Sequence, residues 1–151
     1  CTRLREHYPD IPVWLQARQM DEAARREFLA RFDRAGHGIG FAVLGGVFGE
    51  GVDLPGKRLI GAFVATLGLP QFDAINEAIC VRMQARFGKG HDYTYVYPGL
   101  QKVVQAAGRV IRTETDTGCV LLLDARYREQ RYRALLPSWW KVDLPDALAA
   151  C

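Results

Sequence analysis

The sequence lacks any apolar run near the roughly 20 residues that a helix needs to cross a bilayer. We also expect no signal peptide. Neither sign of charge dominates, because 20 basic and 17 acidic side chains leave a net charge of only +3. We therefore expect a cytoplasmic protein that does not contact a membrane. The charge balance by itself says little about nucleic acid.

Metal-ligand patterns are missing as well. The four cysteines lie far apart, with no C-x-x-C pair and no histidine at ligand spacing. We expect no metal site, and reduced thiols of a cytosolic protein instead of disulfides. The residues concerned are Cys1, Cys80, Cys119 and Cys151, and His7, His37 and His91.

Apolar segments alternate along the chain with segments of helical periodicity. The apolar segments favour strands that are buried on both faces, and strands that alternate with helices are typical of a parallel sheet flanked by helices on both faces. The sequence therefore predicts an α/β fold. We expect strands at 11–16, 37–46, 57–67 and 118–126, and helices at 21–34, 73–87, 98–112 and near 127–136.

The length of 151 residues suits one domain with a real core. Doubly wound domains usually have about five or six strands, which is more than the apolar segments supply. The chain also starts at Cys1 instead of a methionine. We expect residues 1–151 to be a single domain cut from a longer protein, with its first strand missing.

The stretch QAAGRVIR at 105–112 looks costly for stability. On a helical wheel Gln105, Arg109 and Arg112 cluster within about 60° of one another. They lie opposite an apolar arc, and Gly108 borders the polar face, where it would let a ligand approach the backbone. Two interpretations stay open, a solvated amphipathic helix and a phosphate clamp made of guanidinium groups. The apolar arc is formed by Leu100, Val103, Val104, Ala107 and Ile111.

A second unusual stretch, GGVFGEGVDLPG at 45–56, follows a predicted buried strand. It has five glycines and two carboxylates, Glu50 and Asp53. Open α/β sheets bind ligands at the carboxyl ends of their strands, and glycine-rich turns expose backbone N–H groups there. A glycine-rich turn with solvated acids is the alternative.

Together the two stretches resemble the second RecA-like motor domain of superfamily 2 helicases, most closely the iron–sulfur branch that includes DinG and XPD. The likeness spans about residues 10–140. E-G-V-D at 50–53 resembles motif V, and Q-x-x-G-R-x-x-R at 105–112 resembles motif VI. After motif VI, the sequence continues with an Asp-x-Gly and with a strand that ends in Asp-x-Arg, as in the family. LGLP at 67–70 resembles a Leu-Pro turn of the family. The later motif positions are Asp116, Gly118, Asp124 and Arg126.

The resemblance implies a RecA-like fold and an ATP-dependent DNA helicase, a hydrolase of the kind that serves DNA repair. ATP binds between two motor domains of such enzymes. Arg109 and Arg112 would then be the arginine finger pair that reaches the γ-phosphate, and Gln105 would be polar support near the attacking water. Gly108 would border the nucleotide.

The resemblance also assigns Gly51 and Asp53, with Glu50, to the motif V loop that couples nucleotide state to single-stranded DNA. The chain has no G-x-x-x-x-G-K-[ST] loop. ATP and Mg²⁺ would therefore be held mainly by the N-terminal motor domain, the partner within the longer protein. The cysteines that bind an iron–sulfur cluster lie in that half of the family too. We expect this chain alone not to hydrolyse ATP.

Two other functions remain open. One is a RecA-like module that binds nucleic acid or a protein partner without catalysis. The other is a stand-alone nucleotide-binding protein, against which the missing phosphate loop argues. Candidate DNA contacts, each weighed against an ordinary surface or packing role, are Lys57, Arg58, Lys89, the tyrosines of 93–97, Trp139 and Trp140.

Overall fold

The computed structural model describes residues 2–33, 36–50, 54, 56–111 and 116–144. It is mixed α/β with parallel strands in two small sheets, which confirms the predicted fold class. The chain clusters into two compact units, one of Cys1–Phe63 and Gln105–Leu121 and the other of Val64–Val104 and Leu122–Cys151. Within the described ranges, no helix is both long and apolar enough to cross a membrane. That residues 1–151 form a single domain stays a prediction.

The first unit opens with a parallel strand pair. Strand β1 (Val13–Leu15) pairs with β2 (Ile39–Phe41), and Trp14 lies opposite Gly40. Both strands are shorter than the predicted 11–16 and 37–46. A Cβ on Gly40 would lie 2.7 Å from Trp14 Nε1 and 2.6 Å from Phe32 Cζ. Glycine at position 40 therefore makes room for the indole in the small core of this unit.

Helix α2 (Glu22–Ala30) supplies the other side of this core. Asp21 caps it by accepting a 2.8 Å hydrogen bond from the N–H of Ala24, a standard N-cap. Phe28 is buried, and its ring lies 6.4 Å from that of Trp14 in an edge-on arrangement, a favourable geometry for aromatic pairs. The remaining elements of this unit are α1 (Thr2–His7), α3 (Val47–Glu50) and the 3₁₀ turn η1 (Gly56–Arg58).

The second sheet pairs β3 (Gly61–Val64) with β4 (Cys119–Leu122). The N–H of Cys119 donates to Ile60 O at 3.1 Å, and that of Leu123 donates to Val64 O at 2.8 Å. Pairing therefore advances in the same direction along both strands, which makes them parallel. Burial alternates, however, and large side chains of one face are exposed, so the expectation of strands buried on both faces is wrong here. The exposed ones include Phe63, Leu121 and Leu123.

Helix α4 (Ala74–Phe87) of the second unit confirms the predicted helix at 73–87. Asp73 accepts a 2.8 Å hydrogen bond from Asn76 N–H, and Gly88 ends the helix at φ +70. These are the usual N-terminal and C-terminal caps. The apolar side chains of α4 are not packed into a core, since the helix has no buried residue and Ile75 is 74% exposed.

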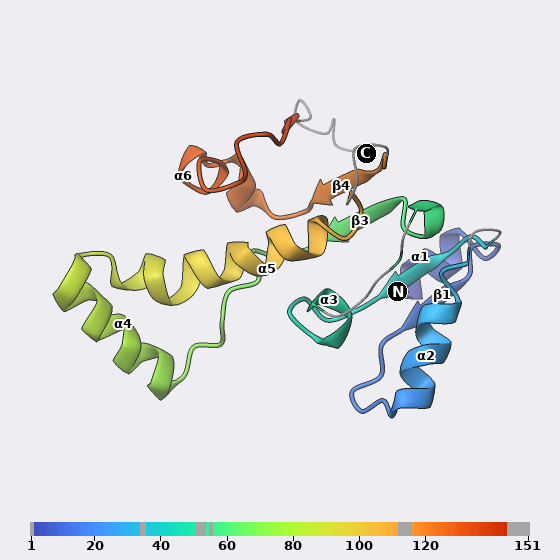
Figure 1. The fold of residues 1–151 in the computed structure, drawn as a ribbon, viewed down its shortest axis with the longest axis horizontal. Helices are drawn as coiled ribbons and strands as arrows, with labels where there is room; N and C mark the ends of the chain where they lie inside the picture. Colours follow the sequence, from blue (N-terminus) through green and yellow to red (C-terminus); the bar gives the residue numbers. More distant parts are fainter. Residues whose placement is uncertain (1, 34–35, 51–53, 55, 112–115, 145–151) are drawn as a thin grey trace. The chain divides into compact units, whose positions relative to one another are not determined.

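The segment at 88–97, predicted as a connection, is mostly helical. The π-helical turn η2 (Asp92–Val96) runs directly into α5 (Tyr97–Ala107), and Tyr97 N–H donates to Asp92 O. Pro98 therefore lies inside a continuous helical stretch and does not start the helix. Because proline has no N–H and crowds the preceding turn, a wider π turn accommodates it. Figure 1 shows α4 and α5 as two arms that diverge from this turn.

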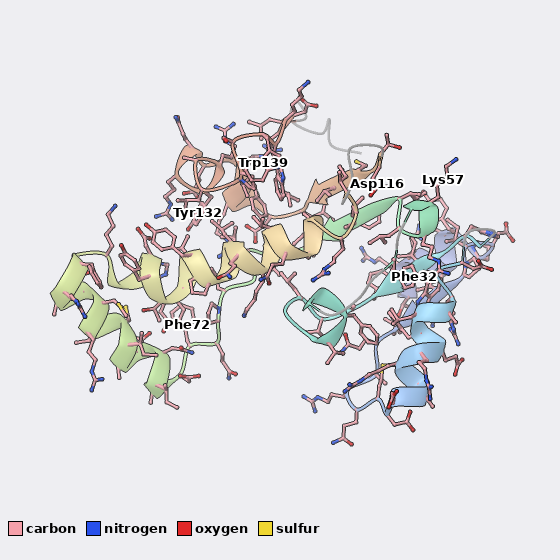
Figure 2. All side chains as sticks on the ribbon, in the orientation of Figure 1. Phe32, Lys57, Phe72, Asp116, Tyr132 and Trp139 are labelled. Atoms are coloured by element: carbon pink, nitrogen blue, oxygen red, sulfur yellow. The ribbon has the colours of Figure 1, made fainter. Side chains whose placement is uncertain are left out.

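Tyr95 on the π turn ties these two arms together. Its ring is 1% exposed and stacks on Phe72 with centroids 4.4 Å apart, and its hydroxyl donates to Glu77 of α4. Burial, together with the bond to Glu77, raises the pKa of Tyr95 to about 12. Figure 2 shows Phe72 between the two helices.

The turn at 66–70 is fixed by residues that follow β4. The hydroxyl of Tyr127 donates to Thr66 O at 3.1 Å, and the backbone N–H of Leu67 contributes to a lowered pKa of Asp124. Leu67 is fully buried, and burial raises the pKa of Tyr127 to about 12. The LGLP motif at 67–70 forms most of this turn, and the burial of Leu67 gives the motif a structural role.

Asp124 also caps the 3₁₀ turn η3 (Ala125–Arg128), which precedes α6 (Gln130–Arg133). It accepts the backbone N–H of Arg126 at 3.0 Å and binds the Arg126 guanidinium at 2.9 and 2.7 Å. The guanidinium, more than any other neighbour, holds the pKa of Asp124 below its usual range. The Asp-x-Arg motif is therefore a structural pair in this fold.

We expect Asp124→Asn to lower the free energy of unfolding at pH 7 by about 1 kcal/mol, since Arg126 is 37% exposed and solvent screens part of the lost charge. A carboxyl with a lowered pKa stabilises the fold above its unfolded-state pKa of about 3.9, and that stabilisation is lost as pH falls through the folded-state value. Urea unfolding of both proteins between pH 7 and pH 3 measures the difference. It should shrink below about pH 4, and the exposed Asp10→Asn should show no such trend; a constant difference would contradict this account.

Gly99 allows α5 to pass directly over the same turn. A Cβ at this position would lie 2.6 Å from Leu67 O and 3.1 Å from Gly68 C. Alanine normally stabilises a helix by about 1 kcal/mol over glycine. Here we expect Gly99→Ala to destabilise the protein by about 1–3 kcal/mol, because backbone must move. Thermal unfolding tests this, with exposed Gln101→Ala on the same helix as control; an unchanged or raised midpoint for Gly99→Ala would refute the close approach.

Candidate nucleotide-binding site

The polar stretch at 105–112 is not a continuous helix. Helix α5 ends at Ala107, so the predicted helix to Arg112 is wrong. Arg109 N–H donates to Ala106 O at 3.1 Å, and Val110 N–H donates to Ala107 O at 3.0 Å. These are the i to i−3 bonds of a tight turn. The physical reason lies in Gly108, because glycine is a poor helix former and ends the helix cheaply.

The turn changes which residues face the core. The apolar arc holds for Leu100, Val103 and Ala107, all buried. It fails beyond the helix end, where Val110 is 3% exposed and Ile111 is 50% exposed. A wheel at 100° per residue no longer applies once the chain tightens into a turn. Val110 is therefore the anchor of this turn, a residue that the helical pattern did not single out.

The structure places three of the four motif VI candidates on this helix end. Gln105 is exposed on the last turn of α5, Gly108 is exposed just beyond it, and Arg109 is half-buried and has an interaction partner within the chain. Arg112 lies outside the described residues. Gln105, Gly108 and Arg109 thus follow one another on a short segment whose buried neighbours, Ala107 and Val110, hold it in place.

Gly118 explains how that segment is held. A Cβ at Gly118 would lie 2.3 Å from Val110 Cγ1 and 3.0 Å from Ile60 O. The missing side chain lets Val110 pack against the start of β4, next to the residue that precedes β3. The glycine of the Asp-x-Gly motif is therefore a close-approach position, and it sets where Arg109 lies relative to the sheet.

The glycine-rich stretch 45–56 contains the short helix α3 and the turn η1 rather than one open loop. A turn precedes α3, in which Gly46 N–H donates to Val43 O at 3.0 Å and Gly45 has φ +75. A positive φ at this turn position favours glycine. Glu50 is the last residue of α3, whereas Gly51 and Asp53 lie outside the described residues.

Two residues that the motifs did not include position α3. The Gln16 side chain accepts the N–H of Val43 at 2.9 Å, and the ring of Phe48 packs on that of Phe28 with centroids 4.4 Å apart. Both tie the stretch before Glu50 to the first sheet and to α2. The sequence offered only one signal for this, a phenylalanine inside a glycine-rich stretch.

Both motif segments fall in the same compact unit, which contains Glu50 as well as Gln105, Gly108 and Arg109. The described residues hold no group of three or more histidine, cysteine, aspartate or glutamate side chains that could bind a metal ion. Cys80 and Cys119 are free thiols. The motif VI residues that the structure describes in this unit are therefore a guanidinium, an amide side chain and an exposed glycine.

The described residues form an α/β fold with parallel strands, and the sequence contains no G-x-x-x-x-G-K-[ST] loop. Residues 1–143 match the helicase C-terminal domain family, and the chain belongs to that family. Its curated relatives include DinG and XPD helicases, which confirms the resemblance carried by the motifs.

Three relatives show the range of the similarity. The chain is 36% identical over 96 residues to the ATP-dependent DNA helicase DinG of Photobacterium profundum, covering 62% of the chain and 14% of that protein. It is 29% identical over 123 residues to a probable ATP-dependent helicase of Methanocaldococcus jannaschii, covering 73% and 18%. It is 30% identical over 114 residues to the XPD helicase subunit of Arabidopsis thaliana, covering 71% and 14%. The chain thus spans less than a fifth of the length of each.

We expect Gly118→Ala to lower the free energy of unfolding by about 1–3 kcal/mol, because the new methyl group collides with Val110 and with backbone at Ile60. Chemical denaturation measures this. Gly36→Ala is the matched control, since its Cβ would meet no atom nearer than 3.5 Å. Equal effects of the two substitutions would show that the contact with Val110 does not hold the turn.

Proposed function

We propose that this chain is the C-terminal motor domain of an ATP-dependent DNA helicase, and that it supplies the arginine fingers of a nucleotide site shared with an N-terminal motor domain. Family membership supports the helicase assignment. The observation that carries the finer proposal is the half-buried Arg109 on a turn fixed by Val110 and Gly118, directly beside exposed Gln105 and Gly108.

The chemistry of the donor set fits the γ-phosphate end of ATP and not its whole length. Guanidinium groups are always charged and match phosphate oxygens in a planar fork. In phosphoryl transfer they meet the charge that develops on the γ-phosphate. Arg109 and Arg112 would do this, and Gln105 would orient the attacking water. An exposed Gly108 leaves the backbone accessible to the nucleotide.

The remaining parts of the ATP site would come from the other domain. The sequence has no phosphate-binding loop, and its described residues offer no carboxylate cluster for Mg²⁺. Bound Mg²⁺ would supply charge neutralisation between the phosphates, held outside this chain. The segment with Glu50, Gly51 and Asp53 would couple the nucleotide state to the single strand, and the isolated chain would hydrolyse no ATP.

We expect Arg109→Ala and Arg112→Ala, each in the full-length helicase, to lower the kcat of DNA-stimulated ATP hydrolysis by about 100-fold or more, because each removes a charge that stabilises the transition state. Arg82→Ala, an exposed arginine on α4, is the control and should leave kcat unchanged. Thermal unfolding of each variant separates lost chemistry from lost folding, since Arg109 is half-buried.

The competing function is a RecA-like module that binds nucleic acid or a protein without catalysis. This alternative predicts the opposite result in the same experiment. Folded Arg109→Ala and Arg112→Ala proteins with wild-type ATPase rates would support it and would exclude an arginine-finger role for the two residues. ATP hydrolysis by the 151-residue chain alone would instead overturn the division of the site between two domains.

A further inference from the structure

A strongly basic segment follows β4, outside the motif residues. Residues 126–141 contain five cationic side chains and one carboxylate, so this segment carries a net charge of +4 in a chain whose total is +3. It forms η3, α6 and the stretch after them. The cations are Arg126, Arg128, Arg131, Arg133 and Lys141.

Two of these five charges are matched locally. Arg126 pairs with Asp124 at 2.7 Å, and Arg131 pairs with Glu129 at 3.0 Å. Within the part of the chain that the structure describes, the other three make no ion pair. The uncompensated cations are Arg128, Arg133 and Lys141. Local pairing therefore leaves three cationic side chains of this segment without an ion-pair partner among the described residues.

Buried side chains anchor the segment that carries these charges. Tyr127, Tyr132 and Leu136 are each less than 9% exposed and face the interior of the second unit. Tyr127 is further fixed by its hydrogen bond to Thr66 O. Alternation of buried aromatic residues with arginines thus holds the cationic side chains on a fixed platform, which lowers the entropy lost on binding.

An open surface cavity of about 580 Å³ lies beside Arg133 in the same unit. Its walls combine polar groups with apolar ones. Nε of Arg133 is buried and has no hydrogen-bond partner in the described structure. A buried donor without an acceptor is costly. The lining residues include Gln130, Arg133, Leu136, Pro137, Ser138 and Trp140.

Two tryptophans complete the surface. Trp140 lines the cavity, and Trp139 next to it is 79% exposed, the highest value among the exposed large apolar side chains that the structure describes. Figure 2 shows Trp139 and Tyr132 in this part of the molecule. Cationic side chains next to aromatic rings are the combination that binds single strands, because phosphates meet the charges and bases stack on the rings.

We propose that this surface, from η3 to Trp140, binds single-stranded nucleic acid, with one base in the cavity against Trp140 and its phosphate at Arg133. None of the residues of this surface belongs to motif V or motif VI. The proposed binding surface adds to the proposed helicase function. It depends on that function in one respect, namely that the strand bound here is the strand along which the motor moves. An acidic protein segment is the rival occupant.

Fluorescence anisotropy of labelled oligothymidine with the 151-residue chain tests the proposal. We expect Trp140→Ala to raise Kd by about 5- to 100-fold, the loss of one stacked base, and Trp140→Phe to recover most of the binding. Arg133→Gln should weaken binding and reduce the slope of log K against log salt by about one, the loss of one phosphate contact. Arg82→Gln on α4 removes the same charge elsewhere and should leave both values at wild type.

Each outcome decides the proposal. Wild-type Kd and salt slope in folded Trp140→Ala and Arg133→Gln proteins would overturn it, and so would oligoglutamate competing as well as oligothymidine of equal charge. Oligouridine in place of oligothymidine tells RNA from DNA binding. Failure of the arginine-finger proposal is seen separately, since it changes ATP hydrolysis by Arg109 and Arg112 variants and leaves this binding intact.

Discussion

The carboxylate of Asp124 is the contact on which the second unit depends most. It accepts hydrogen bonds from the backbone N–H and from the guanidinium of Arg126, and the N–H of Leu67 contributes to its lowered pKa. One side chain thereby caps η3 at the end of β4 and interacts with the turn that follows β3. Its bonds to Arg126 are charge-assisted, and these are stronger than hydrogen bonds between neutral groups. Without it, the turn against which Gly99 packs and the platform that carries Arg128 and Arg133 would lose a common support.

In the first unit, glycines provide the structural support by allowing segments that are far apart in the sequence to come into contact. Gly40 makes room for Trp14, and Gly118 makes room for Val110. The second of these contacts has a functional consequence, because Arg109 precedes Val110 directly. In the proposed helicase, an arginine finger works only if its guanidinium is held where charge develops. A buried valine against a glycine is a simple way to hold the turn that carries it.

The locally encoded features were the predictable ones. Helix α4 was expected at 73–87 and is found at Ala74–Phe87, since Asp73 and Gly88 cap it with their own side chain and backbone. The α/β class and the helicase family could also be predicted, the latter from the spacing of the motif residues. The arginine-finger roles of Arg109 and Arg112 stay predictions, as does the motif V role of Gly51 and Asp53.

By itself, the sequence determined most of the order of helices and strands, the caps of α4 and the family, because these depend on neighbours along the chain. Tertiary structure decided where α5 ends and that Val110, not Ile111, is buried. It also showed that the Asp-x-Arg motif forms an internal ion pair and that the glycine of Asp-x-Gly allows Val110 to pack closely. It also left Ile75 and Phe63 exposed, although periodicity alone places both in a core. The reason is physical: a helical wheel assumes a continuous helix and a covering layer, and only contacts between distant segments show whether either exists.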